Sequence, residues 1–296
     1  MRFTAWAVLL ATLVLWSGNW IVARAVRDDI SPGVATAGRL LIVALVLAPF
    51  VWRGLAAKLP RLSRRDWQVL WLLGFAGGGI HLALQWLGLH FTTATSATLY
   101  LSTAPIFILL LAAPVLGEAI GARQWLGVAV SFCGVALIGT RGEVTRLSFN
   151  IGDFCALLSM VFWGSYTVFL RLRRDALEVL EFIAVVCALG LVIMAPWVVA
   201  EYFIGMRMAL NAAGAAAVLY SALGSLLLAY AGWSYVVTRL GAARAGVTMH
   251  LMPAISVGLA ALFLGERPYW FHFAGVALIL AGVTLSSRAR AAASSP

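Results

Sequence analysis

Long apolar runs alternate with short polar connections along the whole chain. A helix rises about 1.5 Å per residue, so about 20 apolar residues cross the hydrocarbon core of a bilayer. The pattern predicts ten membrane-spanning helices and leaves no room for a separate globular domain. The predicted spans are residues 4–23, 33–52, 67–89, 97–116, 121–140, 151–170, 178–200, 212–236, 245–264 and 269–287.

The composition agrees with this pattern and excludes a soluble enzyme. Of the 296 residues, 63% are hydrophobic and 11% are charged, whereas a soluble domain carries roughly a quarter charged residues. The chain is therefore expected to be an all-α integral membrane protein. The three cysteines, Cys133, Cys155 and Cys187, are scattered within apolar runs, so neither a disulfide framework, a metal site nor another cofactor is expected.

The basic residues indicate orientation in the membrane, because they lie between apolar runs and form no basic stripe for nucleic acid. With the N-terminus inside, fourteen basic residues fall on the inner side and six on the outer side, which predicts cytoplasmic N- and C-termini and a multi-pass protein of the inner (plasma) membrane. The inner set is Arg2, Arg53, Lys58, Arg61, Arg64, Arg65, Arg123, Arg171, Arg173, Arg174, Arg239, Arg244, Arg288 and Arg290. The outer set is Arg24, Arg27, Arg141, Arg146, Arg207 and Arg267.

The chain contains an internal repeat. At an offset of 148 residues, 97–138 aligns with 245–286, and fourteen of the forty-two pairs are identical. At an offset of 147, Trp16 aligns with Trp163. We divide the chain into repeats 1–144 and 145–296. Five spans per repeat force the second copy to enter the membrane inverted, an arrangement typical of secondary transporters, although duplication for stability alone is the alternative.

The repeated motifs resemble the EamA domain of the drug/metabolite transporter superfamily. They are Trp16-Ser17-Gly18-Asn19, Pro105, Leu116-Gly117-Glu118, Gln124, Gly127 and Gly134-Val135, then Pro253, Leu264-Gly265-Glu266-Arg267, Gly275 and Gly282-Val283. The resemblance implies ten helices around a central substrate cavity and export of amino acids or other metabolites. One departure is the opening of the second repeat, Trp163-Gly164-Ser165-Tyr166, where the family has tryptophan, glycine, a polar residue and asparagine or phenylalanine.

Polar and aromatic side chains within the spans are the candidates for substrate binding, because polar groups are costly in hydrocarbon and aromatic rings can stack on a substrate or hold an ammonium group. His81 and Gln85 share a helix face, and Ser102 and His250 are repeat equivalents. The alternatives are helix packing for the rings and local hydrogen bonding for the histidines. The predicted set is Trp16, Asn19, His81, Gln85, Tyr100, Ser102, Trp163, Tyr166, Tyr230, Trp233 and His250.

Two repeat-equivalent prolines, Pro105 and Pro253, fall inside spans four and nine. An interior proline removes a hydrogen bond and kinks a helix, which frees a carbonyl four residues earlier. We predict kinks at these prolines, which act either as hinges and cavity-shaping elements or as tolerated irregularities.

Charged residues are scarce inside the spans. No Asp or Glu lies at a span centre, which disfavours a carboxylate-driven pump, so His81 or His250 would carry any proton coupling and facilitated diffusion is the alternative. Arg39 alone lies well inside a span, and its repeat equivalent is Val186. Arg39 is expected to reach outward or to pair with Asp28 or Asp29, and binding of a substrate carboxylate is the alternative. One such cation does not suit phosphorylated substrates.

We therefore predict a secondary transporter that exports small organic metabolites, foremost neutral or aromatic amino acids, by alternating access. Its partners are the lipid bilayer and a small-molecule substrate, not nucleic acid, and monomer and homodimer both remain open. The alternatives are an efflux carrier for drugs or other metabolites, a membrane-embedded enzyme acting on a lipid-linked substrate, or a helical scaffold. An enzyme is disfavoured because the sequence has no HxxxH or DxxD pair at a bilayer face.

Overall fold

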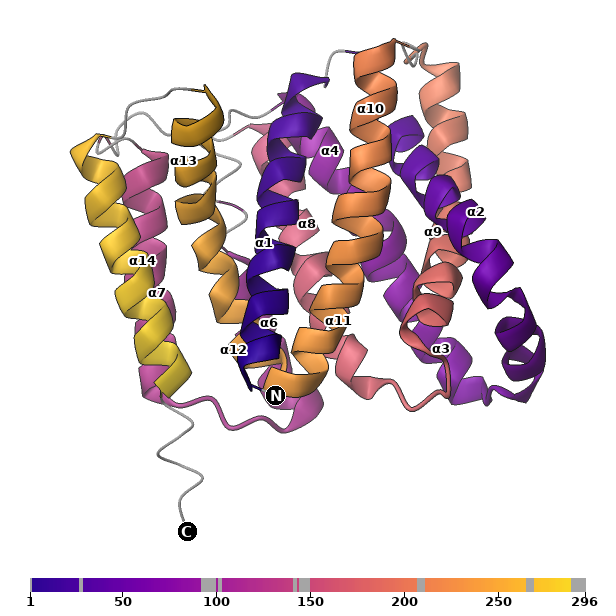
Figure 1. The fold of residues 1–296 in the computed structure, drawn as a ribbon, viewed down its shortest axis with the longest axis horizontal. Coiled ribbons are helices and arrows are strands. Elements are labelled where there is room, and N and C mark those ends of the chain that lie inside the picture. Colours follow the sequence, from indigo (N-terminus) through magenta and orange to yellow (C-terminus); the bar gives the residue numbers. More distant parts are fainter. Residues whose placement is uncertain are drawn as a thin grey trace.

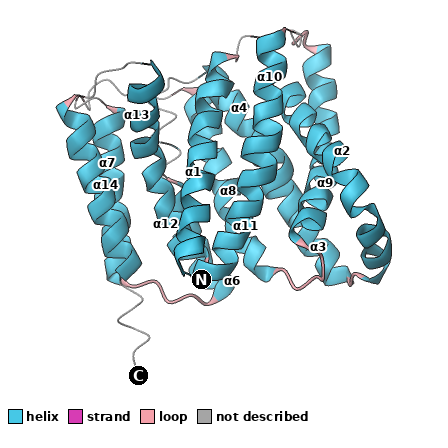
Figure 2. Cartoon of the chain, viewed as in Figure 1, coloured by secondary structure: helices cyan, strands magenta, loops and turns pink. Residues whose placement is uncertain are grey.

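The computed structural model describes residues 2–26, 29–91, 100, 103–140, 143, 150–206, 211–264 and 269–288, and every regular element in these ranges is helical (Figures 1 and 2). The first half contains α1 (Arg2–Ala25), α2 (Pro32–Lys58), α3 (Arg64–Leu73), α4 (His81–Phe91), α6 (Ala104–Leu116) and α7 (Ala122–Gly139). The second half contains α8 (Ile151–Phe169), α9 (Val179–Phe203), α10 (Ala212–Tyr220), α11 (Ala229–Leu240), α12 (Ala242–Val247), α13 (Leu251–Leu264) and α14 (Trp270–Arg288).

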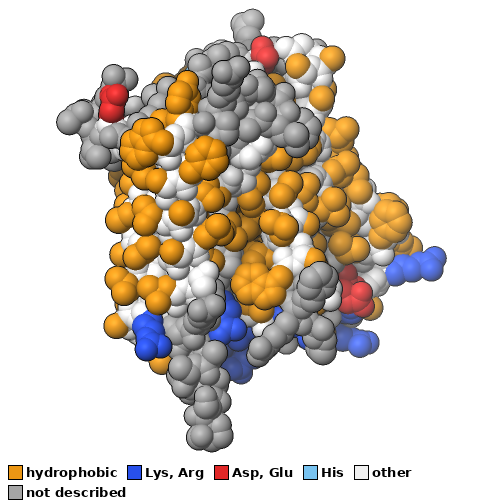
Figure 3. All heavy atoms as spheres, turned by 60° about the vertical axis from the view of Figure 1, so that its left-hand side comes forward, with side chains coloured by type: hydrophobic (Ala, Val, Ile, Leu, Met, Phe, Trp, Pro, Cys, Tyr) orange, Lys and Arg blue, Asp and Glu red, His pale blue; other side chains and the backbone are white. Residues whose placement is uncertain are grey.

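Six helical stretches in the described residues are long and apolar enough to cross a membrane. They are Thr4–Ala23, Pro32–Arg61, Arg64–Phe91, Ile151–Leu172, Val179–Phe203 and Ala212–Leu240. Three further apolar helices are shorter, namely Ala104–Leu116, Ala122–Ile138 and Trp270–Ser286. Large apolar side chains such as Leu45, Phe50 and Phe273 are exposed, and Figure 3 shows hydrophobic side chains over much of the lateral face of the bundle. Such extended apolar surface suits contact with lipid.

Several helices begin at side-chain caps that the sequence encodes. The Ser31 hydroxyl accepts a hydrogen bond from the N–H of Val34, and Pro32 occupies the first turn of α2. Asn150 and Asp153 cap α8 reciprocally, as do Ser63 and Asp66 at α3. These contacts satisfy N–H groups that a helix start leaves unpaired, which fixes where the spans begin.

The pair α7 and α14 shows that equivalent helices of the two halves run antiparallel. A Cβ atom added at Gly127 would lie 2.6 Å from the carbonyl oxygen of Gly282, and one added at Gly134 would lie 2.5 Å from that of Gly275. Because Gly127 and Gly275 are repeat equivalents, as are Gly134 and Gly282, the contact is a pseudo-twofold crossing. Only glycine allows the two backbones to approach this closely.

The helices α2 and α9 form the second antiparallel pair of equivalents. At one end, the Lys58 ammonium lies 2.7 Å from a carboxylate oxygen of Glu181. At the other end, both carboxylate oxygens of Glu201 accept from the N–H of Gly33 at 2.9 Å, and one accepts from Trp197 Nε1. Glu201 therefore caps the N-terminus of α2 from a different helix. Its negative charge interacts favourably with the partial positive charge of that helix end.

Two π-helical segments occupy equivalent positions in the repeats. One is Gly74–Ile80, between α3 and α4, and the other is Ser221–Leu228, between α10 and α11. At the offset of 147 residues, Gly74 corresponds to Ser221. Such segments widen the helix and are frequent at functional sites. The hydrophobic pattern of the sequence does not predict them, because a π segment has no distinctive hydrophobic period.

The prolines of spans four and nine lie at helix starts and not in helix interiors. Pro105 is in the first turn of α6 after Thr103, and Pro253 is in the first turn of α13, after a 3₁₀ turn at Thr248–His250. An irregular turn therefore precedes each proline, at Thr103 and at Thr248–His250, and the roles of the two prolines as kinks or hinges stay predictions. The missing N–H costs little in the first turn, which explains this placement.

Candidate functional site

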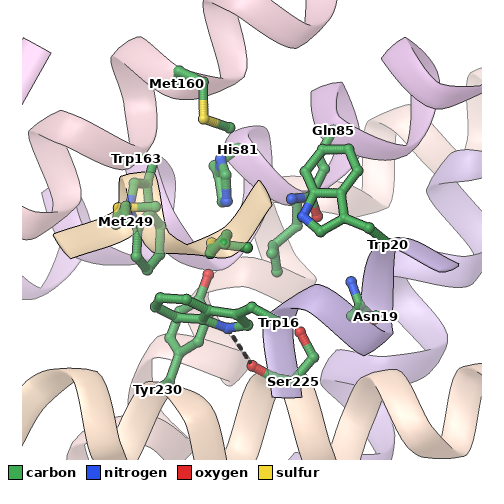
Figure 4. A pocket seen from close by; sticks show the side chains of 12 residues that line it. Trp16, Asn19, Trp20, His81, Gln85, Met160, Trp163, Ser225, Tyr230 and Met249 are labelled. Carbon is green, nitrogen blue, oxygen red and sulfur yellow. Dashed lines mark hydrogen bonds between the residues drawn. The ribbon is translucent and has the colours of Figure 1, made fainter. Parts of the chain in front are cut away.

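A small cavity is lined by helical elements of both halves (Figure 4). Its volume is about 30 Å³, which is room for one or two water molecules. The lining consists of Trp16, Asn19, Trp20, His81, Leu82, Gln85, Met160, Trp163, Ser225, Tyr230, Met249 and Met252. The lining thus combines aromatic, polar and sulfur-containing side chains.

Five aromatic rings form a continuous cluster around one wall of this cavity. Trp16 and Trp163, the repeat equivalents, meet edge to face with ring centroids 5.0 Å apart. Trp163 also stacks on Tyr166 at 5.3 Å and contacts Tyr230 at 5.5 Å, while Trp233 lies 5.3 Å from Trp16. We call Trp16, Trp163, Tyr166, Tyr230 and Trp233 the aromatic cluster. Its rings offer faces and edges at the distances that aromatic pairs prefer.

Two rings of the aromatic cluster are held by carbonyl groups of the π segments. Trp16 Nε1 donates to the carbonyl of Ser225 at 3.0 Å, as Figure 4 shows, and the Tyr230 hydroxyl donates to the carbonyl of Gly77 at 2.9 Å. Ser225 belongs to the π segment of the second repeat and Gly77 to that of the first. Each π segment is therefore linked to the opposite repeat through an aromatic side chain.

The amide and imidazole side chains of the lining come from the first repeat. His81 Nδ1 lies 2.9 Å from the carbonyl oxygen of Ser159, so Nδ1 carries the proton as donor and Nε2 remains an acceptor. Its ring lies 5.0 Å from that of Trp163. Asn19 Oδ1 accepts from the hydroxyl of Ser221 at 2.6 Å, and Gln85 lies on the same helix as His81. The lining thus presents neutral hydrogen-bonding groups beside the rings.

The structure brings most of the predicted binding residues together. Six of them line the cavity, namely Trp16, Asn19, His81, Gln85, Trp163 and Tyr230. Tyr166 and Trp233 lie behind this lining, fully buried in the aromatic cluster.

The other three predicted residues are placed differently. His250 is buried and its Nδ1 contacts the Ser131 hydroxyl of α7, away from the lining. Tyr100 is half-buried and its carbonyl accepts from the Thr103 hydroxyl, also away from the cavity. Ser102 lies outside the described residues.

Half of the lining residues are not among those predicted from the sequence. These residues are Trp20, Leu82, Met160, Ser225, Met249 and Met252. Methionine and leucine give no chemical signal in an apolar span, although Met249 and Met252 are spaced i, i+3 around His250 and a helical-wheel argument can place them on one face. Methionine side chains adapt their shape readily, which suits a cavity that changes form.

Within the described residues, no group of three or more His, Cys, Asp or Glu side chains is arranged to hold a metal ion. The three cysteines are free, with Cys155 and Cys187 buried. The lining of the cavity supplies aromatic rings for stacking and polar groups for hydrogen bonding.

The inverted pairs, the paired π segments and a central cavity define a two-repeat membrane transporter fold. Comparison with known families gives the same class: residues 3–140 and 150–288 each match the EamA-like transporter family. The chain belongs to this family, and it is thereby a multi-pass membrane transporter of the drug/metabolite transporter type.

Known relatives match along nearly their whole length. The chain is 31% identical to a "Probable terminal-alkyne amino-acid exporter" from Streptantibioticus cattleyicolor, covering 96% of this chain and 93% of that protein. It is 29% identical to an uncharacterized transporter from Archaeoglobus fulgidus, covering 95% and 96% of the two chains. One crystal structure superposes with a TM-score of 0.73 at 19% identity over 100% of both chains, which shows the shared fold.

Proposed function

We propose that the protein exports small organic metabolites, foremost neutral or aromatic amino acids, across the inner membrane by alternating access. The observation that carries the proposal is the cavity between the repeats, where the aromatic cluster meets the neutral polar groups of Asn19, His81 and Gln85. Rings of this kind hold an apolar or aromatic side chain, and the polar groups bond its amino-acid portion. The amino-acid exporter among the relatives supports this substrate class.

The small size of the cavity supports a conformation in which the two repeats lie close together around it. Ligand pockets measure about 300–1,000 Å³, whereas this cavity encloses about 30 Å³. Substrate entry then requires the repeats to separate on one side. The π segments lie where such bending is easiest, because their backbone hydrogen bonds already depart from the α pattern.

The same proposal includes ten spans with both termini in the cytoplasm. Spans four and nine are then the interrupted ones, with α6 and α13 as their continuous parts. Lys and Arg side chains gather at the end of the bundle where α1 begins and α14 ends (Figures 1 and 3). That end faces the cytoplasm under the positive-inside rule.

Counterflow in proteoliposomes tests the substrate class. Vesicles loaded with unlabelled L-phenylalanine should accumulate labelled L-phenylalanine from outside, and preloaded L-leucine should support uptake better than preloaded L-glutamate. Repeating the assay with and without a pH gradient distinguishes proton coupling from facilitated diffusion. Empty liposomes and liposomes with heat-denatured protein are the controls. Absence of counterflow for every neutral amino acid would rule out the assignment.

A further inference from the structure

Arg39 is buried in the interior of the bundle, contrary to the expectation that it reaches outward. It lies seven residues after Pro32, about two turns into α2, and its side chain is 1% exposed. Among the described residues, no carboxylate lies within ion-pair distance of it, Asp29 included, while Asp28 lies outside those residues. An isolated cation at this depth is costly and by default marks a functional site.

The contacts of Arg39 leave hydrogen-bonding capacity unused. Its Nη2 donates to the carbonyl oxygen of Leu82 at a long 3.3 Å, and its guanidinium lies 5.7 Å from the centre of the Trp86 ring. Its Nε has no acceptor. The buried Nε1 of Trp86 and the buried hydroxyl of Thr36 also lack partners. Thr36 is one turn before Arg39 on the same face of α2.

These three groups are donors without acceptors on two adjoining helices, α2 and α4. A buried donor left unsatisfied typically costs about 1–3 kcal/mol, and an uncompensated charge adds to that cost. A single anionic group with several acceptor oxygens would satisfy Arg39, Thr36 and Trp86 together. The single guanidinium matches one negative charge, as on a carboxylate, better than the two charges of a phosphate ester.

The position of Arg39 connects this donor set to the cavity. Arg39 binds the backbone of Leu82, and the side chains of Leu82 and Gln85 line the cavity from the same helix, α4. Trp86 follows Gln85 directly in sequence. The second repeat has Val186 at the equivalent position and so offers no matching cation. The donor set therefore lies behind the first-repeat wall of the cavity, next to its polar groups.

We infer that Arg39, Trp86 and Thr36 form the site for the carboxylate group of the transported molecule. When the cavity opens, the carboxylate replaces the long contact between Arg39 and Leu82, and the substrate side chain lies against the aromatic cluster. This inference rests on the proposed function and makes it more specific, because it requires a monocarboxylate substrate.

Ligand pairs that differ only at the carboxylate test the inference. Purified protein in nanodiscs is titrated calorimetrically with L-phenylalanine and with L-phenylalaninamide, in which a neutral amide replaces the carboxylate. We expect Arg39→Gln to weaken phenylalanine binding at least tenfold and to leave phenylalaninamide binding unchanged or improved. Arg39→Lys should retain an intermediate affinity for phenylalanine. Lys58→Gln, which removes a cation outside the cavity, is the matched control.

The outcomes separate the inference from the function on which it rests. If wild-type protein binds both ligands and Arg39→Gln weakens both equally or neither, Arg39 has a structural role and the inference is wrong. If wild-type protein binds neither ligand, the proposed function fails first. Should Arg39→Gln not fold, Thr36→Val decides, because it keeps the shape of the side chain. We expect it to weaken phenylalanine binding severalfold without affecting the amide, and equal effects would overturn the inference.

Discussion

The two repeats share a frame but differ in the chemistry they bring to the cavity. Trp16 and Trp163 meet near its centre, and the π segments begin at equivalent residues. Against this symmetry, the amide and imidazole lining residues Asn19, Gln85 and His81 all come from the first repeat, while the second repeat adds Ser225. The repeat equivalents of Asn19, Gln85 and His81 are Tyr166, Gly232 and Leu228.

The second repeat contributes sulfur and aromatic groups instead. Met160, Met249 and Met252 line its side of the cavity, and Trp163 Nε1 lies 3.1 Å from the sulfur of Met249. This difference between the lining side chains suggests two separate roles. Equivalent glycines and π segments support the movement of the repeats, while the side chains that differ between the repeats orient the substrate. Four predictions test these roles, from the largest expected effect to the smallest.

The close crossing of α7 and α14 should tolerate substitution least. Gly134→Leu places a large side chain where even a Cβ atom would lie 2.5 Å from the Gly275 carbonyl oxygen. Overpacking typically costs about 1–3 kcal/mol, and more where backbone blocks relaxation. We expect loss of monodisperse protein in size-exclusion chromatography. Gly258→Leu is the control, because no atom lies within 4 Å of a Cβ at this exposed site. Equal behaviour of the two variants would refute the close crossing of α7 and α14.

The polar lining residues His81 and Gln85 should influence the transport rate more strongly than the lining methionines Met249 and Met252. We expect His81→Leu combined with Gln85→Leu to reduce amino-acid counterflow at least tenfold, since each lost hydrogen bond contributes about 0.5–1.5 kcal/mol and 1.4 kcal/mol is a factor of ten. Met249→Leu combined with Met252→Leu nearly conserves volume and should stay within threefold of wild type. Initial rates in proteoliposomes with matched protein content provide the comparison. A reversed order of effects would show that the repeats do not divide their roles in this way.

The contact between Trp16 and the π segment should have a smaller effect. Trp16→Phe keeps an aromatic ring but loses the hydrogen bond to the Ser225 carbonyl. The expected loss is about 0.5–1.5 kcal/mol, or a two- to tenfold lower transport rate. Trp125→Phe on exposed α7 surface is the matched control. A transport rate unchanged from wild type would mean that this bond does not support the conformation in which the repeats lie close together.

Substitutions at the two ends of the α2 and α9 pair should change the stability of the protein by different, small amounts. Glu201 is buried and accepts from Gly33 and Trp197, so Glu201→Gln should destabilise by about 0.5–2 kcal/mol. The pair of Lys58 with Glu181 is partly exposed, and Lys58→Ala should destabilise less than Glu201→Gln, because exposed ion pairs contribute little. Thermal unfolding of the purified variants measures both. A larger loss from Lys58→Ala would contradict the account of the caps.

The sequence predicted the fold class, the repeat and the centre of the cavity because each rests on local pattern or on self-similarity. Equivalence of Trp16 and Trp163 identified the aromatic pair, and the spacing of His81 and Gln85 identified the polar face. The position of His250 against Ser131 was not predictable, because which face of a broken helix turns inward depends on the 3₁₀ turn before Pro253. The inward placement of Arg39 was not predictable either, since it depends on packing between α2 and α4.

Photo-crosslinking tests the central claim, that an amino acid binds between the repeats, most directly. Purified protein is irradiated with a diazirine analogue of L-phenylalanine, and labelled peptides are mapped by mass spectrometry with and without excess L-phenylalanine. The account predicts labelling at cavity-lining residues, foremost Met160, Trp163 and Met249, that excess phenylalanine suppresses. Labelling confined to the exposed outer surface, or cavity labelling that phenylalanine does not suppress, would contradict it.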